Sequence, residues 1–476
     1  MSQTEYDICI IGGGAGGLVV AAGGAALGAK VVLVEKKHLG GDCLHYGCVP
    51  SKTLLHSARV AQAMRNAGKF GLPEAPPQVD LPTVMKHVQQ VISTIEVNDS
   101  PQRFRDMGVE VIFGAGRFTS SECFQVDGHD LTAKTFVIAT GSRPAIPPVP
   151  GLDKVPYLTN ESIFSLNEAV EHLIIMGGGP IGIEMCQAFI RLGSRVTVVE
   201  RSPQILPRED HELVAIVAAR LAQEGVEFRL NSTASNVSCA EGEIALTLSD
   251  TDGKESILRG SHLLVSAGRR SNVDGLGLKQ AGVEVVQGRI KTDAHLRTSN
   301  RKIFGCGDVV GPYQFTHMAE HHAGVVLRNA IFHLPAKIEQ RVIPWCTFTE
   351  PELARVGLSE TEARKQNIPC EVFSFPFHDI DRAQAEGETE GMAKIITNSR
   401  GKLLGAALVG PNAGELIHEY TLALAKGMKA ADLSSVIHIY PTLAQINRRV
   451  ADQRMKTGLT PRRLKWIKRL FGLRGS

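Results

Sequence analysis

The sequence has little of what marks secreted, fibrous or nucleic-acid-binding proteins. Aromatic residues make up only 5% of its 476 residues, and its formal net charge is +3. So small a charge provides no general basic field, and we expect no nucleic-acid partner. The nine cysteines are odd in number, and only Cys43 and Cys48 form a close pair. This pattern argues against a secreted disulfide framework and favours the reducing cytoplasm.

One uncharged run is long enough to resemble a membrane span. Residues 8–29 are 22 residues without a charge, enough to cross a bilayer. Eight of them are glycines, Glu5 and Asp7 precede them, and no basic segment comes first. A signal peptide or a membrane helix has a different composition and different flanks. We therefore expect no membrane span here and a cytoplasmic protein.

Glycine, by contrast, is abundant. The 48 glycines and an apolar share of 43% fit a glycine-rich α/β protein. The chain is too long for one hydrophobic core, so we expect about three domains.

A strand, a tight turn, a helix and a second strand follow one another near the start of the chain. The pattern predicts strands over 7–11 and 30–35 and a helix over 15–27. Glycines with the spacing G-x-G-x-x-G lie where the first strand turns into the helix: Gly12, Gly14 and Gly17. They allow the turn, the approach of a pyrophosphate and close helix–strand packing. Glu35 ends the second strand, where it can accept hydrogen bonds from a ribose, so we predict a dinucleotide site.

The same pattern recurs in the middle of the chain. Its glycines are Gly177, Gly179 and Gly182, and Glu200 ends the next strand. Two sites suggest two dinucleotides, such as a flavin and a nicotinamide. The carboxylate of Glu200 would repel the 2′-phosphate of NADP, so we predict NADH rather than NADPH. Arg201 lies next to it and keeps NADPH open as the alternative.

Cys43 and Cys48 allow three interpretations: part of a metal site, a structural disulfide or a redox pair. Zinc sites commonly use four ligands, and only His45 and His56 lie near the pair in sequence, so we expect no metal. A structural bridge that closes so short a loop would constrain the unfolded chain little. In a cytoplasmic chain such a pair is more often catalytic. We interpret it as redox-active.

The residues after the pair support this interpretation. Pro50 suits the first turn of a helix, which would place Cys48 near the helix N-terminus. A thiolate is stabilised there. Lys52, four residues after Cys48, would lie on the same face of the helix.

With these features, the chain resembles the pyridine nucleotide–disulfide oxidoreductases over roughly residues 5–455. These flavoenzymes include glutathione reductase, dihydrolipoamide dehydrogenase and mercuric ion reductase. The stretch GGDCLHYGCVPSK is similar to the family signature GG-T-C-x-x-x-G-C-x-P-[ST]-K, with Asp42 in place of the usual threonine. The resemblance implies an α/β fold with two Rossmann-like dinucleotide-binding domains, for FAD and NAD, and an α+β C-terminal dimerisation domain.

The resemblance also implies a homodimer and a division of the chain. We expect an FAD-binding domain that carries the redox pair over 1–150, an NAD(P)-binding domain over 151–272 and the second part of the FAD-binding domain over 273–340. The dimerisation domain is expected over 341–456 and a basic amphipathic tail over 457–476.

Site residues follow from the resemblance position by position. Those implied for FAD are Gly12, Gly14, Gly17, Glu35, Gly41, Thr140, Gly141, Asp308 and His317, and those implied for NAD are Gly177, Gly179, Gly182, Glu200 and Gly268. Cys48 would be the thiol nearest the flavin, and Cys43 the thiol that meets substrate. Lys52 would lie beside the flavin and pair with Glu184. The implied route takes a hydride from NADH to the flavin, then electrons through the Cys43–Cys48 disulfide to a small acceptor.

The chain departs from the family in its carboxy-terminal third. Disulfide-reducing members carry a His-Pro-Thr-x-x-Glu motif, whose histidine shuttles a proton at the partner subunit's disulfide. Here Tyr440 and Gln445 occupy the histidine and glutamate positions, and His438 lies two residues too early. Histidine titrates near about pH 6.5 and tyrosine near about 10. Tyr440, the candidate catalytic residue at this position, is therefore a poor proton shuttle at neutral pH.

This substitution favours an acceptor that needs no proton from the protein, such as a soft metal ion or a quinone. We predict a mercuric-reductase-like metal ion or a quinone-type acceptor, with dihydrolipoyl dehydrogenase activity as the alternative. Mercuric ion reductases carry a cysteine pair near the carboxy terminus, however, and the last cysteine here is Cys370. A flavin monooxygenase also carries two dinucleotide fingerprints, but it has no use for the C-x₄-C pair, so we disfavour that class of enzyme.

A non-catalytic flavoprotein scaffold at a membrane surface is the alternative from another class of protein. It would not need the cysteine pair, Lys52 or Glu184, so their presence speaks against it.

The tail carries a separate signal. The spacing predicts a helix over 461–474 with an apolar side and a basic side. The apolar side holds Leu464, Trp466, Ile467, Leu470, Phe471 and Leu473, and the basic side holds Arg462, Lys465, Lys468 and Arg469. Arg463 and Arg474 do not fall on the basic side. Basic residues without an acid, together with a tryptophan, are typical of an interfacial membrane helix. Residues 459–476 are thus candidates for contact with the inner face of a membrane; a helix docked on the protein's own dimer, or a frayed end, is the alternative.

Overall fold

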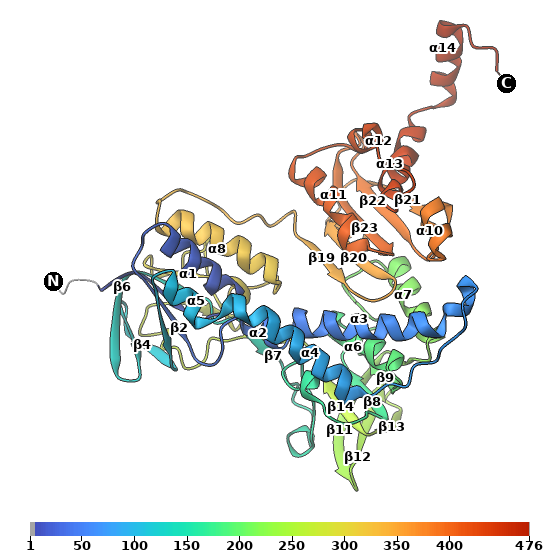
Figure 1. The fold of residues 1–476 in the computed structure, drawn as a ribbon. Helices are drawn as coiled ribbons and strands as arrows, with labels where there is room; N and C mark the ends of the chain where they lie inside the picture. The colour runs from blue at the N-terminus through green and yellow to red at the C-terminus, as the bar shows by residue number, and fades with distance from the viewer. Residues whose placement is uncertain (1–4, 476) are drawn as a thin grey trace. The chain divides into compact units, whose positions relative to one another are not determined.

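The computed structural model describes residues 5–475. The chain forms two compact units: unit 1 comprises Met1–Arg201 and Ser232–Ile338, and unit 2 comprises Ser202–Asn231 and Glu339–Ser476. Figure 1 shows their helices and strands. Both glycine fingerprints and the cysteine pair belong to unit 1, and Tyr440 and Gln445 belong to unit 2.

The first sheet of unit 1 contains the first fingerprint. Its strands are β1 (Tyr6–Ile11), β2 (Val31–Glu35), β3 (Val109–Phe113), β4 (Gly116–Ser120), β5 (Cys123–Val126), β6 (His129–Ile138) and β18 (Ile303–Gly305). Parallel pairing gives the order β3-β2-β1-β6, β18 also pairs in parallel with β6, and β5 and β4 extend β6 as antiparallel strands. A first strand in the middle of a parallel sheet is the arrangement of a dinucleotide-binding domain.

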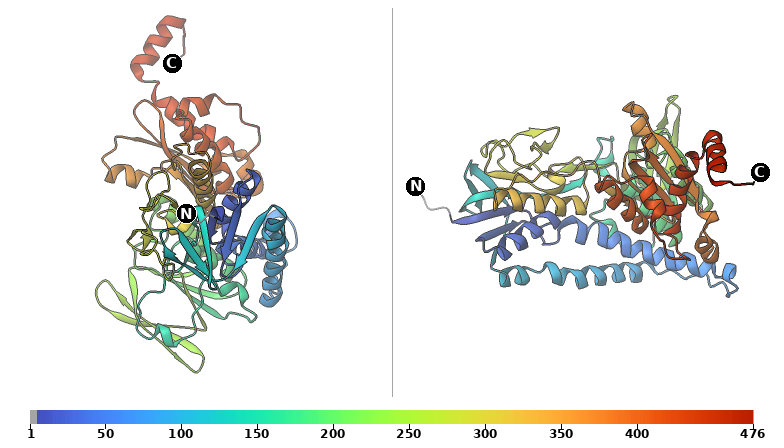
Figure 2. Two further views of the ribbon diagram at one scale, coloured as in Figure 1. Left: turned by 90° about the vertical axis from the view of Figure 1, so that its left-hand side faces the viewer. Right: turned by 90° about the horizontal axis from the view of Figure 1, so that it is seen from above.

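Seven α-helices belong to the part of unit 1 that the structure describes. They are α1 (Ala15–Ala26), α2 (Gly41–His45), α3 (Cys48–Arg65), α4 (Leu81–Glu96), α5 (Pro101–Asp106), α6 (Pro180–Arg191) and α8 (Thr316–Ala330). Figures 1 and 2 show α1 beside α8, and α3 beside α4. The redox pair lies on α2 and α3, so two helices of this unit position it.

Strands β1 and β2 of the first sheet are buried on both faces, because successive side chains of a strand point to opposite faces of its sheet. Along β1, Ile8 and Ile10 face a core that includes side chains of α1 and α8. Cys9 and Ile11 face a second core, which includes aromatic side chains of β4 and β5. Both cores hold β1 in place, and thereby the glycine turn that follows it.

A second parallel sheet in unit 1 contains the other fingerprint. Its strands β8 (His172–Met176), β9 (Arg195–Val199) and β14 (His262–Val265) pair in the order β9-β8-β14. An antiparallel sheet of β11 (Ser232–Ala240), β12 (Glu243–Asp250) and β13 (Glu255–Gly260) shares a hydrophobic core with it. Two short antiparallel pairs complete the unit: β7 (Ser142–Pro144) with β15 (Arg269–Ser271), and β16 (Val285–Val286) with β17 (Arg289–Ile290).

Unit 2 contains an antiparallel sheet in the order β19-β20-β23-β22-β21. The strands are β19 (Pro344–Thr347), β20 (Glu352–Gly357), β21 (Glu371–Pro376), β22 (Met392–Thr397) and β23 (Leu403–Gly410). The other elements are α7 (His211–Gln223), β10 (Glu227–Arg229), α9 (Glu360–Lys365), α10 (Asp381–Glu386), α11 (Ala413–Ala425), α12 (Ala430–Ser435), α13 (Gln445–Thr457) and α14 (Pro461–Phe471). Helices α11 and α13 pack on the sheet and complete its core.

A buried lysine joins the two chain segments of unit 2. The side chain of Lys394 on β22 is only 3% exposed. Its ammonium lies 2.9 Å from Asp210 and 2.7 Å from Glu360, and it also bonds to Glu212. These three carboxylates lie close enough together to suit a metal ion, but the ammonium already occupies the space among them.

The helices and strands expected near the fingerprints are present, with shifted ends. Residues 8–29 contain β1 and α1, and no helix within residues 5–475 is long and apolar enough to cross a membrane. The helix predicted to begin near Pro50 begins at Cys48, so the cysteine is its first residue. The predicted tail helix ends at Phe471, not 474, because Gly472 adopts a left-handed φ of 64°.

Candidate active site

The first fingerprint forms a cradle that only glycines allow. A Cβ on Gly12, whose φ is +108°, would lie 2.4 Å from the carbonyl oxygen of Ala139, and a Cβ on Gly17 would lie 1.9 Å from that of Gly12. A Cβ on the middle glycine, Gly14, would have no neighbour nearer than 3.9 Å. Close packing around two glycines and open space at the third are what a bound pyrophosphate requires. Glu35 accepts a 2.7 Å hydrogen bond from the Gly13 N–H, which fixes its carboxylate beside this space.

The second fingerprint repeats this geometry. A Cβ on Gly177 would lie 2.6 Å from the Ser266 carbonyl, and one on Gly182 would lie 2.2 Å from that of Gly177. Nothing lies within 4 Å of a Cβ on Gly179. Glu200, which is 8% exposed, accepts a 2.7 Å hydrogen bond from the Gly178 N–H. The two cradles fit two dinucleotides, as the sequence predicts.

The other residues predicted for FAD gather around the first cradle. A Cβ on Gly41 would lie 2.7 Å from Gly14 Cα, so α2 starts directly against the fingerprint. The Thr140 hydroxyl donates to the Asn272 carbonyl at 2.7 Å. Gly141, predicted for FAD, and Gly268, predicted for NAD, adopt φ of 69° and 129°. At both, the left-handed backbone favours glycine.

Asp308 and His317 follow β18, the last strand of the first sheet along the chain. Asp308 accepts a 2.6 Å hydrogen bond from the Ser142 hydroxyl, and burial raises the pKa of its carboxyl. His317, the second residue of α8, stacks on Phe315 with ring centroids 5.2 Å apart. The structure thus places both residues in unit 1, one after β18 and one at the start of α8.

Asp42, the departure from the family signature, takes part in a charge network that the sequence does not reveal. Its carboxylate lies 3.1 Å from the Arg269 guanidinium and accepts a 3.0 Å hydrogen bond from Asn160. Arg269 also donates to the Ser142 hydroxyl at 2.8 Å, and that hydroxyl donates to Asp308. Two carboxylates near one cradle would repel a diphosphate, and the Arg269 guanidinium between them offsets part of that charge.

Asn160 fixes the short helix that carries Cys43. Its side-chain amide donates to the Asp42 carboxylate at 3.0 Å and to the Tyr46 carbonyl at 3.1 Å. Asp42 directly precedes Cys43 on α2, and Tyr46 directly follows that helix. Asn160 is 8% exposed, so the side chain that makes both hydrogen bonds is shielded from water. The position of Cys43 is therefore set by side chains from distant parts of the sequence.

Cys43 and Cys48 interact directly, and they have opposite acidities. The hydrogen bond from the Cys43 thiol, the Thr316 hydroxyl and the Lys52 charge together lower the pKa of Cys48 to about 6, against the effect of burial. The hydrogen bond with Cys48 and burial raise the pKa of Cys43. The Thr316 hydroxyl, at the start of α8, lies 3.6 Å from Cys48 Sγ. At neutral pH the pair therefore holds one thiolate, on Cys48.

Lys52 and Glu184 form the ion pair that the family resemblance implies. Lys52 Nζ lies 2.8 Å from Glu184 Oε2. The Glu184 side chain on α6 is 6% exposed, and that of Lys52 on α3 is 36% exposed. One lysine thus neutralises a buried carboxylate and also favours the Cys48 thiolate.

The structure brings the Tyr440 hydroxyl to a carboxylate in unit 2. The hydroxyl donates to Asp381 at 3.0 Å, and this hydrogen bond raises the pKa of Tyr440. The side-chain amide of Gln445, the first residue of α13, makes a long contact of 3.5 Å with the Ile439 carbonyl. Since its pKa moves further from neutrality, Tyr440 is an even poorer acid–base group than a free tyrosine.

His438 does not take over the role of the missing histidine. Its side chain is 5% exposed, and its ring nitrogens face the Val436 carbonyl and the Glu419 carboxylate, both at 3.0 Å. Glu419 in turn accepts a 2.8 Å hydrogen bond from Asn447. Both ring nitrogens are therefore occupied within unit 2, and neither faces outward.

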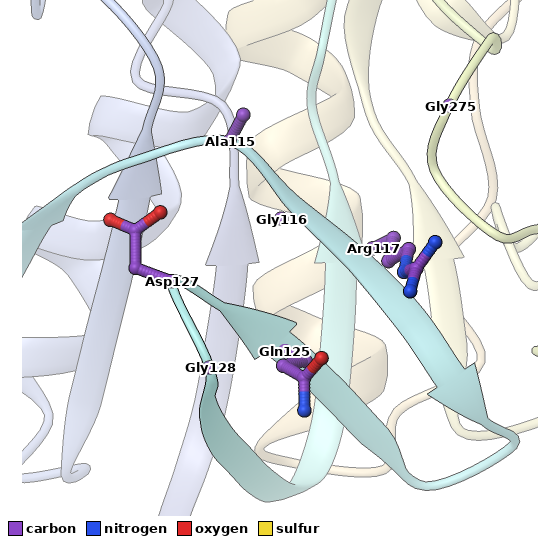
Figure 3. Close-up of a pocket in the computed structure, with 7 residues that line it drawn as sticks. All are labelled: Ala115, Gly116, Arg117, Gln125, Asp127, Gly128 and Gly275. Atoms are coloured by element: carbon purple, nitrogen blue, oxygen red, sulfur yellow. The ribbon is translucent and has the colours of Figure 1, made fainter.

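A hollow of about 320 Å³ lies elsewhere in unit 1, along β4 and β5. Its lining residues are Ala115, Gly116, Arg117, Gln125, Asp127, Gly128 and Gly275. Figure 3 shows the side chains of Arg117, Gln125 and Asp127 spread along the hairpin rather than pointing at one another. None of the predicted site residues lines it, and it has no convergent set of chemical groups.

Comparison with known proteins decides the family. The chain matches the family model of the pyridine nucleotide-disulphide oxidoreductases over residues 6–323, and the dimerisation domain of that family over residues 343–450. The chain belongs to this family. It is therefore an FAD-dependent oxidoreductase that uses NAD(P)H, and the predicted fold of two Rossmann-like domains with a C-terminal dimerisation domain is confirmed. The dimerisation-domain match also supports a homodimer acting on a small molecule.

Relatives within the family differ in activity. Mercuric reductase of Bacillus cereus is 35% identical over 443 residues, 93% of this chain and 70% of that protein. Dihydrolipoyl dehydrogenase of Chlamydia muridarum is also 35% identical, over 448 residues, 93% of this chain and 95% of that protein. A solved structure, the Cu(II) complex of the HOCl-induced flavoprotein disulfide reductase RclA from Escherichia coli, has a TM-score of 0.85 at 26% identity and covers 95% of this chain and 100% of that one. Similarity alone therefore leaves the acceptor open.

Proposed function

We propose that this oxidoreductase passes electrons from NADH, through FAD and the Cys43–Cys48 pair, to a soft metal ion or a quinone-type acceptor. The Tyr440–Asp381 contact carries this choice, because it gives a raised pKa to the tyrosine that stands where disulfide-reducing relatives have a histidine. Losing a general acid–base typically costs about 10²–10⁴-fold in rate. An acceptor that needs no such group avoids that loss.

The residues of unit 1 have separate roles in this proposal. Bound FAD accepts a hydride and passes on electrons, which is the chemistry of the cofactor rather than of the protein. Glu200 favours NADH over NADPH by repelling a 2′-phosphate. Cys48 is the thiolate held ready by Lys52, and Cys43 is the thiol that meets the acceptor. Glu184 holds Lys52 in place.

The two acceptor classes use this site differently. Two thiolates bind a soft metal ion well, so the Cys43 thiol loses its proton to solvent when the ion binds beside the Cys48 thiolate. One NADH supplies the two electrons that reduce a divalent ion to the metal. A quinone takes two electrons and two protons to become a quinol, and these protons come from NADH and from solvent. In neither case does Tyr440 have to give up a proton.

Dihydrolipoyl dehydrogenase activity is the second candidate, because a relative with that name is as similar as the mercuric reductase. When a disulfide acceptor such as lipoamide is reduced, its sulfur needs a proton to leave as a thiol, and Tyr440 is poorly suited to supply it. A non-catalytic scaffold is disfavoured by the depressed pKa of Cys48 and by the Lys52–Glu184 ion pair, which a scaffold does not need.

An acceptor panel tests the proposal. Purified enzyme with FAD is assayed for NADH oxidation with Hg²⁺, Cu²⁺, a water-soluble quinone and lipoamide, and each rate is compared with that of Cys43→Ser. Fast turnover with a metal ion that is lost in Cys43→Ser indicates that the cysteine pair holds the ion. Fast turnover with the quinone that persists in Cys43→Ser indicates that the quinone takes its electrons from the flavin. Fast lipoamide turnover with none for the other three would refute the proposal and favour dihydrolipoyl dehydrogenase.

We also propose that the enzyme is cytoplasmic and lies at the inner face of a membrane through residues 459–476. Helix α14 supports this placement, because its side chains combine exposed apolar groups with basic ones.

A further inference from the structure

The helix α14 exposes large apolar side chains that nothing in the structure covers fully. Trp466 is 62% exposed, Leu470 56% and Phe471 67%. None of the eleven residues of α14 is buried. Figure 1 shows α14 as the last helix of the chain, beyond α13. Contiguous exposed apolar surface of this kind marks a binding site.

Local signals build this helix, so it does not depend on packing against unit 2. The Thr460 side chain caps its start by accepting from the Arg463 N–H, and Pro461 occupies the first position. Gly472 ends it in a left-handed conformation. The apolar residues are therefore not needed to hold the helix in place, and they are available to a partner.

Charge identifies the partner. From residue 459 to residue 475 the chain contains no acid, and the basic residues are Arg462, Arg463, Lys465, Lys468, Arg469 and Arg474. In a symmetric dimer, α14 packed against its copy would bring two strongly basic helices together, which like charges oppose. An anionic surface suits both the basic residues and, if it is a bilayer, the apolar ones.

A second exposed apolar segment of unit 2 provides the contrast. Ile437 is 93% exposed, Ile439 78% and Tyr440 66%. This segment, 436–441, contains only uncharged side chains and His438, whose ring is held by Glu419. It lies within the residues matched to the dimerisation domain, so a second copy suits it. The basic helix α14 lies outside that match and calls for a different partner.

We propose that α14 lies flat in the surface of an anionic lipid bilayer, with Trp466, Leu470 and Phe471 inserted among the acyl chains and the basic side (Arg462, Lys465, Lys468 and Arg469) at the lipid phosphates. The proposal deepens the proposed function and rests on it in one respect: a lipid-soluble quinone becomes the favoured acceptor, since the enzyme then works where such a quinone is dissolved. The reaction stays balanced, with NADH oxidised to NAD⁺ and the quinone reduced to the quinol with one proton taken from solvent.

Vesicle binding by the full-length FAD-loaded enzyme tests this contact. The probes are vesicles of phosphatidylcholine alone and of phosphatidylcholine mixed with phosphatidylglycerol. We expect sedimentation with the mixed vesicles only, lost on raising the salt concentration. We expect binding to be lost both on deletion of residues 459–476 and in the variant Leu470→Ser/Phe471→Ser. A control variant, Arg400→Gln/Lys426→Gln, removes two exposed basic residues of the same unit and should bind like the unmodified enzyme.

The chain offers its own reporter, since it has only two tryptophans. Trp345 is held by a 2.7 Å hydrogen bond to Glu209, whereas Trp466 is exposed. Insertion predicts a blue shift of tryptophan emission with anionic vesicles, and Trp466→Phe should remove the shift.

Three results would overturn the inference. They are equal sedimentation with and without residues 459–476, no sedimentation by the full-length enzyme at low salt, and a fall in mass from dimer to monomer on deletion, which would assign α14 to the subunit contact. Vesicle binding is measured without turnover. An enzyme that binds vesicles but reduces no quinone would therefore contradict the acceptor and leave the membrane contact standing.

Discussion

The redox site in unit 1 and the Tyr440 segment in unit 2 have diverged to different extents. In unit 1 the structure brings Lys52 to Glu184 as a 2.8 Å ion pair near the cysteine pair. In unit 2 the Tyr440 hydroxyl, at the position where we expect a histidine from the family resemblance, bonds to Asp381. We propose that the means of delivering electrons is retained, while the means of delivering a proton is not. This difference, rather than overall similarity, points to the acceptor.

The largest expected effect comes from removing either thiol. Cys43→Ser and Cys48→Ser should lower metal-ion reduction by more than the about 10²–10⁴-fold that loss of an acid–base group typically costs. Both sulfurs are needed to hold the ion and to carry two electrons. NADH should still bleach the flavin, because that step precedes the thiols. The measurement is NADH oxidation with Hg²⁺, beside an anaerobic spectrum.

Cys239→Ser is the matched control for both variants. Cys239 is an exposed free cysteine on β11. It should reduce metal ions at the unmodified rate. A comparable loss of metal-ion reduction in Cys239→Ser would mean that the activity does not depend specifically on the Cys43–Cys48 pair.

A smaller effect is expected from the surroundings of Cys48. Its pKa is lowered from 9.0 to about 6, first by the Cys43 hydrogen bond and then by Thr316 and Lys52. The thiolate should therefore persist as the pH falls from 9 towards 6 and disappear below about 6. Cys43→Ala should raise the pKa of Cys48 most, and Lys52→Met should raise it less. At a pH below the pKa, a rise of one pKa unit lowers the rate of alkylation about tenfold. The measurement is the pH dependence of alkylation of the reduced holoenzyme by iodoacetamide.

Lys69→Met, which removes an exposed lysine of the same unit, serves as the control and should leave the alkylation profile in place. Because the two cysteines titrate as a pair, the inflection belongs to the pair rather than to one sulfur. An unmodified enzyme whose alkylation rate still rises steeply above pH 8 would contradict the assignment of a thiolate to Cys48.

The smallest effect is expected at Tyr440 itself. Tyr440→Phe removes the hydroxyl and its contact with Asp381, yet turnover with metal ion or quinone should change by less than about twofold, far below the loss of a working acid–base group. The measurement is kcat and kcat/KM with both acceptors across pH 6–9. A hundredfold loss would show that Tyr440 does move a proton, and the contrast between the two regions would disappear.

The sequence predicted the parts of the site that depend on short spacing. The glycine fingerprints need only a strand, a turn and a helix, so their geometry follows from local rules. The helix after Cys48 was expected for the same reason, although it starts at the cysteine rather than near Pro50. The Lys52–Glu184 pair was expected only from family resemblance, because 132 residues separate its members.

Long-range contacts were not predictable from the sequence. Asn160, Arg269 and Thr316 reach the redox helices from distant segments, and no local pattern marks them. Only the odd aspartate in the signature, Asp42, was a hint that a compensating cation had to lie nearby. The same limit applies to Lys394, whose carboxylate partners lie up to 184 residues away.

We propose that the Tyr440 segment has lost the family's proton shuttle, while the Cys43–Cys48 site still delivers electrons. The decisive measurement is NADH oxidation with lipoamide by the variant Tyr440→His/Gln445→Glu, which restores the shuttle, beside the unmodified enzyme. We expect slow lipoamide turnover by the unmodified enzyme and a gain of up to about 10²–10⁴-fold in the double variant. Metal-ion or quinone turnover should not change. Fast lipoamide turnover by the unmodified enzyme, with no gain in the variant, would contradict the claim.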